Sequence, residues 1–182
     1  GAFSKNQKSK RFRVNPDNQQ KEFVIAWDEE TSIGKDVVIT QKDIRQIQLA
    51  KGALYAGCKL MMRRMGVKSL DAVKIAGAFG THVDKEKALI MGLFPDCDLD
   101  IVRSVGNAAG DGARVVLLDR SMRDEANRIA RNVEYVELSV EKDFQREFMA
   151  AMYIPHMKDA FPHLKGLVPE DVLHQESPDE TK

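Results

Sequence analysis

Cysteine is scarce in this chain. Only Cys58 and Cys97 occur among 182 residues, far apart and without a C-x-x-C pair. Zinc sites and iron-sulfur clusters need three or four such ligands at short spacing, so neither can be built from the thiols of this chain alone. We expect two free thiols, because a disulfide is not maintained in a reducing compartment.

Long apolar runs and an excess of charge of either sign are also missing. The longest apolar runs, 88–94 and 115–118, are far shorter than the roughly 20 residues that cross a bilayer, and the N-terminus lacks the apolar core of a signal peptide. Lys and Arg balance Asp and Glu at 28 each, which argues against nucleic acid or an anionic membrane as a partner. We therefore expect a cytoplasmic protein.

What the chain does contain is an alternation of strand-like and helix-like patterns. Strands are expected at 11–14, 22–27, 36–39, 73–76, 101–105 and 133–138, with the first two forming a β-hairpin. Helices are expected at 41–65, from Asp84 through Gly92 and at 121–132. One more is expected after a cap at Asn107 or Asp111, and another after a cap at Ser139. This order predicts an α/β fold with a mixed sheet and flanking helices. We expect a disordered segment at 1–10, one globular lobe at 11–154 and an extended tail at 155–182.

The longest predicted helix carries clear end signals. Thr40 stands at the N-cap with Asp43 three residues later, and Gly66 follows the last periodic residue. Gly52 and Gly57 each weaken the helix by roughly 1 kcal/mol relative to Ala, so we expect a close packing contact or a nearby ligand at these positions.

Two glycine-rich turns, 77–80 and 106–112, each lie between a predicted strand and a predicted helix. Glycine lets a ligand or another backbone approach where a Cβ would collide, so such a turn can seat a phosphate or a nucleoside. Neither turn matches the P-loop or the dinucleotide fingerprint. The spacing alone therefore leaves two readings open: a nucleotide site, or turns that only allow tight packing.

Several segments together resemble a known family. Residues 39–54, 75–80, 88–95 and 104–114 resemble the C-terminal part of the reductive activators of corrinoid proteins, and the match extends through 133–138 and 144–155. The resemblance implies a ribonuclease H-like lobe of the ATP-binding domain shared by actin, sugar kinases and heat-shock proteins. It also implies a role in returning a Co(II) corrinoid to Co(I) on the corrinoid protein of a methyltransferase system.

The resemblance further implies cofactors and site residues. ATP and Mg would bind in the full-length protein, and an iron-sulfur cluster would lie in a part of the parent chain not present here. The corrinoid protein is the implied partner, and a homodimer is compatible with the pattern. The positions assigned to the nucleotide are Gly77, Ala78, Phe79, Gly80, Gly106, Asn107, Gly110 and Gly112. Lys51 or Asp43 is expected to face the nucleotide cleft.

This chain departs from the family pattern because it lacks cluster cysteines, a phosphate loop and the metal-binding acid of a first lobe. We therefore expect a fragment that is inactive in isolation, and we assign no catalytic residue and no metal ligand. One alternative is a docking module for the corrinoid protein, using Met61, Met62 and Met65 or the segment after Pro155. Another is a kinase-like enzyme of the same superfamily, for which His82 is the only candidate general base.

Overall fold

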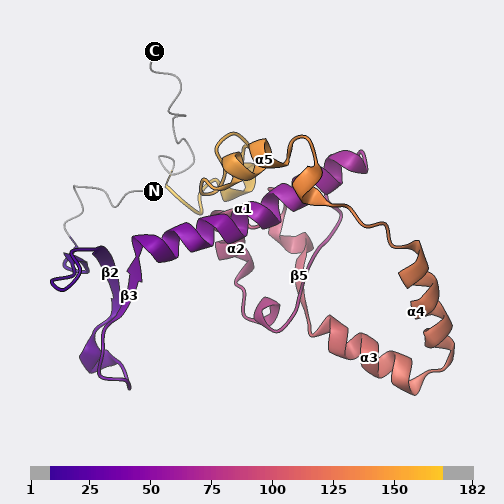
Figure 1. The fold of residues 1–182 in the computed structure, drawn as a ribbon, viewed down its shortest axis with the longest axis horizontal. Helices are drawn as coiled ribbons and strands as arrows, with labels where there is room; N and C mark the ends of the chain where they lie inside the picture. The colour runs from indigo at the N-terminus through magenta and orange to yellow at the C-terminus, as the bar shows by residue number, and fades with distance from the viewer. Residues whose placement is uncertain (1–8, 170–182) are drawn as a thin grey trace, which may run out of the picture.

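The chain forms helices and two small sheets, one of which lies at the start of the longest helix (Figure 1). The computed structural model describes residues 9–169. The strands are β1 (Phe12–Val14), β2 (Lys21–Ala26), β3 (Val37–Thr40), β4 (Val73–Ala76) and β5 (Val102–Gly106). The α-helices are α1 (Gln41–Arg64), α2 (Lys85–Met91), α3 (Ala108–Leu118), α4 (Ser121–Asn132) and α5 (Phe144–Ala151). The expected α/β class is confirmed.

The strands divide into an antiparallel group and a parallel pair. β1, β2 and β3 form one antiparallel sheet, in which Phe12 pairs with Phe23 and Phe23 with Ile39. The predicted hairpin and third strand are therefore confirmed. β4 and β5 form a separate parallel pair, with Val73 opposite Val102. The two strand types thus occupy two sheets in the described residues, whereas we expected them in one mixed sheet.

Helix α1 is the spine of the molecule and begins and ends where the sequence predicts. The Thr40 side chain accepts a hydrogen bond from the Asp43 backbone N–H, and the Asp43 carboxylate accepts one from the Thr40 N–H at 2.8 Å. This reciprocal capping box satisfies two of the donors that a helix start leaves without partners. Gly66 directly follows the C-cap residue Met65.

The two glycines inside α1 mark close helix packing. A Cβ on Gly52 would lie 3.4 Å from side-chain atoms of Phe148 and Met152 on the α5 side. A Cβ on Gly57 would lie 3.3 Å from Leu138. Figure 1 shows α5 lying along α1. Both glycines therefore lie at packing contacts, Gly52 against α5 and Gly57 against Leu138, so the packing explanation is confirmed. Glycine weakens the helix at these positions but leaves room for the neighbouring side chains.

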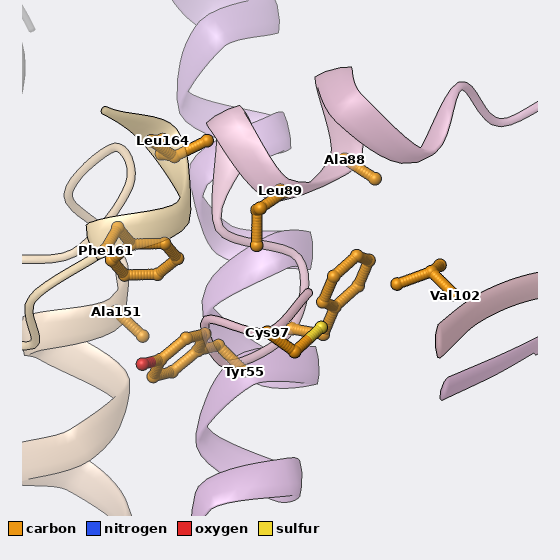
Figure 2. Packing of buried hydrophobic residues seen from close by; sticks show 9 residues of the cluster. Tyr55, Ala88, Leu89, Cys97, Val102, Ala151, Phe161 and Leu164 are labelled. Atoms are coloured by element: carbon orange, nitrogen blue, oxygen red, sulfur yellow. The ribbon is translucent and has the colours of Figure 1, made fainter. Parts of the chain in front are cut away.

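The hydrophobic core brings together α1, the α2 region, β5 and the end of the described chain (Figure 2). Its buried side chains are Tyr55, Ala88, Leu89, Phe94, Cys97, Val102, Ala151, Phe161 and Leu164. Phe161 and Leu164 lie in the segment that we expected to be an extended tail from residue 155. Because both are buried, residues 155–169 are part of the folded body, and the remainder of that segment lies outside the described residues, as does 1–8.

A buried polar cluster fastens this last segment to α1. Lys51, Tyr55 and Lys59 occur at four-residue spacing and therefore share one face of the helix. The Lys51 ammonium donates to the carbonyl oxygens of Tyr153 and, at 2.6 Å, of Pro155. The Tyr55 hydroxyl and the Lys59 ammonium donate to one carboxylate oxygen of Asp159, at 2.6 and 2.5 Å.

Burial and these contacts shift the acid–base properties of the cluster. Burial lowers the pKa of Lys51 to about 8, and it also lowers the pKa of His156, whose ring stacks on Tyr55. Burial acts to raise the pKa of Asp159, but the hydrogen bonds from Lys59 and Tyr55 outweigh it and lower that pKa overall. Lys51 is therefore an amine held in a dry site at a cost in stability.

Two expectations for residues 133–140 are wrong. The alternating residues 133–138 form no strand and belong to neither sheet, and Tyr135 is 79% exposed. Alternation alone cannot make a strand, because a strand needs a neighbour to pair with. We also expected Ser139 to cap the following helix, but α5 begins at Phe144 with Asp143 at the N-cap position.

We predict that Leu164→Ala lowers the free energy of unfolding by roughly 2–5 kcal/mol, because Leu164 is fully buried and its loss leaves a cavity. The matched control is Leu167→Ala, since Leu167 is 42% exposed and should lose less than about 1 kcal/mol. Urea unfolding of both variants measures the difference. Equal effects would show that the 155–169 segment is not packed into the core.

We also predict that Lys51 makes stability rise with pH between about 8 and 10.5. Its folded pKa, about 8, lies below the ordinary value of 10.5, so the unfolded chain binds more protons in this window. Relative to the native protein, Lys51→Met should lose this rise, which amounts to about 3 kcal/mol because one pKa unit corresponds to about 1.4 kcal/mol. Urea unfolding at several pH values measures both profiles, and parallel profiles would contradict the prediction.

Candidate functional site

The two glycine-rich turns meet at the carboxyl ends of β4 and β5. The strands run parallel, so the two turns that follow them leave the sheet at the same edge. Open α/β sheets bind their ligands at this edge. The Gly77 N–H donates to the Gly106 carbonyl oxygen at 2.7 Å. This bond extends the ladder by one step beyond Ala76, which is already paired with Gly106. We call residues 77–81 and 106–110 the glycine corner.

Backbone conformation explains the glycines at the centre of the corner. Gly77 has φ of +104° and Gly106 has φ of +65°, both in the region that L side chains rarely adopt. A Cβ on Gly77 would have no heavy atom within 4 Å apart from its chain neighbours. Conformation therefore requires glycine at Gly77, and the space beside it is open for a ligand.

The turn after Gly77 packs tightly back on β4. Residues Phe79–Thr81 form a 3-10 turn, and the Thr81 hydroxyl donates to the Ala78 carbonyl oxygen at 2.6 Å. A Cβ on Gly80 would lie about 3.0–3.2 Å from Ile75 atoms, which is too close for a real side chain without movement. Gly80 is therefore a packing glycine, in contrast to Gly77.

The second turn starts helix α3. The Asn107 side-chain oxygen accepts a hydrogen bond from the Gly110 N–H at 3.1 Å, as expected for an N-cap residue. A Cβ on Gly110 would lie 2.5 Å from the Asn107 amide nitrogen, so glycine is needed for this cap. The start of α3 thus points its positive dipole end and backbone donors toward the corner.

The structure brings most of the sequence-predicted binding residues together. Gly77, Ala78, Gly80, Gly106, Asn107 and Gly110 lie in the corner, as does the backbone of Phe79. Gly112 instead lines a groove with Ala113, Val116, Leu117 and Arg123 on the α3 and α4 side. The use of these residues by a nucleotide stays a prediction.

Two further expectations concerned side chains of α1. Lys51 does not face the corner, because its ammonium is buried against the carbonyl groups of residues 153 and 155. The carboxylate of Asp43 accepts hydrogen bonds from the backbone N–H and the hydroxyl of Thr40 at the start of the helix. The four-residue spacing from Lys51 through Tyr55 to Lys59 was the signal for the buried cluster, which sequence reasoning missed.

A cavity of about 580 Å³ lies at the end of α1 that is remote from Thr40, among residues that include Tyr55, Lys59, Arg63 and Asp96. Its charged lining is largely paired within the protein. Lys59 contacts Asp159, Arg63 contacts Asp143 and Glu147, and Asp96 contacts His163 at 2.6 Å. We therefore place the candidate site at the glycine corner, where no side chain covers the backbone at Gly77.

The polar groups of the corner are backbone groups, the Thr81 hydroxyl and the Asn107 amide. His82, next to it in sequence, is exposed, and no interaction of it with the corner residues marks it as a general base. Within residues 9–169, no group of three or more His, Cys, Asp or Glu side chains is placed to hold a metal ion. None of the described helices is long and apolar enough to pass through a bilayer.

Comparison with known proteins agrees with the resemblance that the sequence suggested. A family model described as the C-terminal domain of RACo, the ASKHA domain, matches residues 1–165. The corrinoid activation enzyme RamQ of Eubacterium limosum is 41% identical over 141 residues, covering 76% of this chain and 24% of that protein. A Methanosarcina barkeri protein named [Co(II) methylated amine-specific corrinoid protein] reductase is 27% identical over 124 residues, covering 66% of this chain and 23% of that protein.

A solved structure is also similar. The reductive activator for corrinoid, iron-sulfur protein superposes with a TM-score of 0.75 at 39% sequence identity, covering 87% of this chain and 25% of that one. The chain thus spans about a quarter of the length of the relatives that it matches. With the family model matching nearly the whole chain and the fold shared with a close relative, this chain belongs to the family of RACo C-terminal domains, which have the actin-like ATPase (ASKHA) fold.

Proposed function

We propose that this chain is the C-terminal lobe of the ATP-binding domain of an ATP-dependent reductive activator, which returns Co(II) corrinoid on a methyltransferase corrinoid protein to Co(I). The observation that carries the proposal is the glycine corner, where two turns joined by the Gly77–Gly106 hydrogen bond leave open backbone beside a helix start. The names of the relatives, which specify corrinoid activation and a Co(II) corrinoid protein, supply the substrate.

Two features of the corner support nucleotide binding. The open space at the missing Cβ of Gly77 is of the kind that a flat nucleoside can enter, and the start of α3 favours negative charge. Gly77 and Ala78 would support the nucleoside through their backbone, Gly80 packs the turn on β4, and Asn107 and Gly110 keep the start of α3 in place. ATP with Mg, when bound, supplies the free energy that shifts the activator between conformations.

An iron-sulfur cluster does not fit the residues described here. Cys97 is buried in the core and Cys58 lies on the exposed side of α1, so no set of thiols is assembled. In the proposal the cluster is held elsewhere in the parent chain, and this lobe supplies nucleotide binding alone. The same proposal includes a cytoplasmic location and is compatible with a homodimer.

The alternatives gain no specific support. A docking module would need a free segment after Pro155, but residues 155–169 are packed against α1 through Pro155, Asp159 and the core residue Phe161. Met61 and Met65 are exposed on α1, as single apolar residues often are on a helix surface. A kinase-like enzyme would need a general base, and the corner presents none.

We predict that Gly77→Val in the full-length parent protein weakens Mg-ATP binding at least about tenfold, because the new side chain fills the open space and disfavours φ of +104°. Isothermal titration calorimetry measures the affinity. The absorbance change of the corrinoid protein from Co(II) to Co(I), in the presence of a reductant, should slow in parallel.

Gly66→Val is the matched control. Gly66 also has a positive φ, of +66°, and a Cβ there would also meet nothing within 4 Å, but it lies at the end of α1 and outside the corner. The control also places valine at a positive φ, in the left-handed helical region, and should keep its ATP affinity. If the two variants bind Mg-ATP equally well, the corner is not the nucleotide site.

A further inference from the structure

Two histidines lie in the chain segment that follows α5 and packs against α1. We call residues 153–164 of this segment the clasp, with His156 near its start and His163 near its end. The Lys51 ammonium and the Tyr55 hydroxyl of α1 both donate hydrogen bonds to the clasp. The two imidazoles differ in burial, since the His156 side chain is 1% exposed and the His163 side chain is 48% exposed.

The His156 ring supplies an acceptor to the backbone of the clasp. Its Nδ1 accepts hydrogen bonds from the backbone N–H groups of Lys158 and Asp159, at 3.2 and 2.9 Å. Only an unprotonated ring nitrogen can accept, so the ring proton is assigned to Nε2 and the imidazole is neutral. Nε2 is buried and has no hydrogen-bond partner among the described residues. Protonation of Nδ1 would therefore break two hydrogen bonds and place a positive charge in a buried site.

The groups around His156 do not reverse this preference for the neutral ring. The charged or titratable side chains that face it come from α1, α5 and the clasp itself and are Lys51, Tyr55, Lys59, Glu147 and Asp159. The two lysines repel an imidazolium and the two carboxylates attract it, whereas Tyr55 stays neutral because burial raises its pKa. Burial of the ring is the largest effect, and it lowers the pKa of His156 below the ordinary value of 6.5.

His163 has the opposite environment. Its Nδ1 lies 2.6 Å from one carboxylate oxygen of Asp96, and its backbone N–H donates to the other oxygen at 3.3 Å. Asp96 belongs to the connection between α2 and β5, and Asp98 in the same connection adds negative charge. A carboxylate binds an imidazolium more strongly than a neutral imidazole. The hydrogen bond with Asp96 is therefore the main cause that raises the pKa of His163 above 6.5.

The clasp also contacts the end of α2. A Cβ on Gly92 would lie 2.2 Å from the Pro155 carbonyl oxygen, and the Lys51 ammonium donates to that same oxygen. Phe161 and Leu164, further along the clasp, are buried in the hydrophobic core. A clasp that loosens from α1 would therefore also release the end of α2, the helix that follows the glycine corner.

We propose that the protonation of its two histidines controls the attachment of the clasp to α1 and to the α2–β5 connection. The His156 ring supports this attachment only while it is neutral, and the His163 ring supports it most strongly while it is protonated and paired with Asp96. Acid therefore loosens the clasp at His156, and alkali weakens its contact at His163. The inference does not depend on the proposed function, because it concerns a contact within the chain and no ligand.

The direction of each pH effect follows from the two shifts. The folded pKa of His156 lies below 6.5, so the released segment binds more protons in acid. Attachment is lost as the pH falls from 6.5 through the folded pKa. The folded pKa of His163 lies above 6.5, so its contribution is complete below 6.5 and is lost as the pH rises through the folded pKa. Attachment should be strongest between these two pKa values.

Amide hydrogen exchange of the full-length parent protein, measured without nucleotide, tests the acid side. After correction for the intrinsic pH dependence of exchange, clasp amides should be at least about threefold less protected at about pH 5 than at about pH 6.5. Amides of β2 are the internal reference and should change by less than about twofold, because β2 lies at the start of α1, away from α5 (Figure 1). An unchanged clasp, or an equal change in β2, would overturn the inference.

His156→Asn separates titration of the ring from its structural role. The Asn side-chain oxygen can accept the same N–H groups in place of Nδ1, but it binds no proton in this pH range. Whatever its overall stability, the variant should keep its clasp protection within about twofold between about pH 5 and 6.5. His163→Asn is the matched variant and should retain the acid loss of the native protein. Equal acid losses in the two variants would contradict the role of His156.

A measurement on the native full-length protein needs no substitution and decides the question even if His156→Asn does not fold. Hydrogen exchange at the imidazole C2 position reports the pKa of each histidine. His156 should titrate below 6.5 and His163 above it. The reverse order, or two histidines that titrate together, would overturn the inference. Since no nucleotide is present, failure of ATP binding would leave these results unchanged.

Discussion

The contact of α1 with α5 and with residues 153–164 is the constraint on which the rest of the body depends. Gly52 lets α5 approach, and Lys51 binds the carbonyl groups of the chain that follows α5. Gly92 stands at the end of α2, where any side chain would collide with Pro155, so the same contact places α2. Because α2 links the glycine corner to β5, packing at α1 determines where the corner lies. The hydrogen bonds of the Lys51 ammonium to the carbonyl oxygens of Tyr153 and Pro155 offset part of the cost of burying its charge.

The glycine corner, the candidate site, is built almost without side-chain chemistry. Its central contact joins two backbone groups, and its only side-chain cap is the amide of Asn107. Such a site suits a ligand that brings its own charge and its own metal, as a nucleotide does. It does not suit general acid–base catalysis, which needs a titratable group near the reacting atoms. This is why the role proposed for the lobe is nucleotide binding.

The hydrophobic core and helix α3 differ in how much apolar surface they bury. Leu89, Leu164 and Tyr55 are buried in one core, whereas Leu117 and Leu118 of α3 are exposed to solvent.

The local elements of this fold could be read from the sequence, because their signals act over a few residues. The Thr40 and Asp43 cap, the hairpin before it and the start of α3 at Asn107 all follow from short-range patterns. The glycine corner was also found in this way, since positive φ is possible for glycine with little strain. The strand expected at 133–138 was wrong, as was the extended tail for residues 155–169, because pairing and burial depend on residues far away in the sequence. The first segment has no neighbouring strand among the described residues, and the second packs against α1. The sequence by itself thus determined most helices, the turns and the family. Only the tertiary structure decided the partners of Lys51, the burial of Leu164 and the exposure of Leu117. These depend on contacts between residues up to about a hundred positions apart.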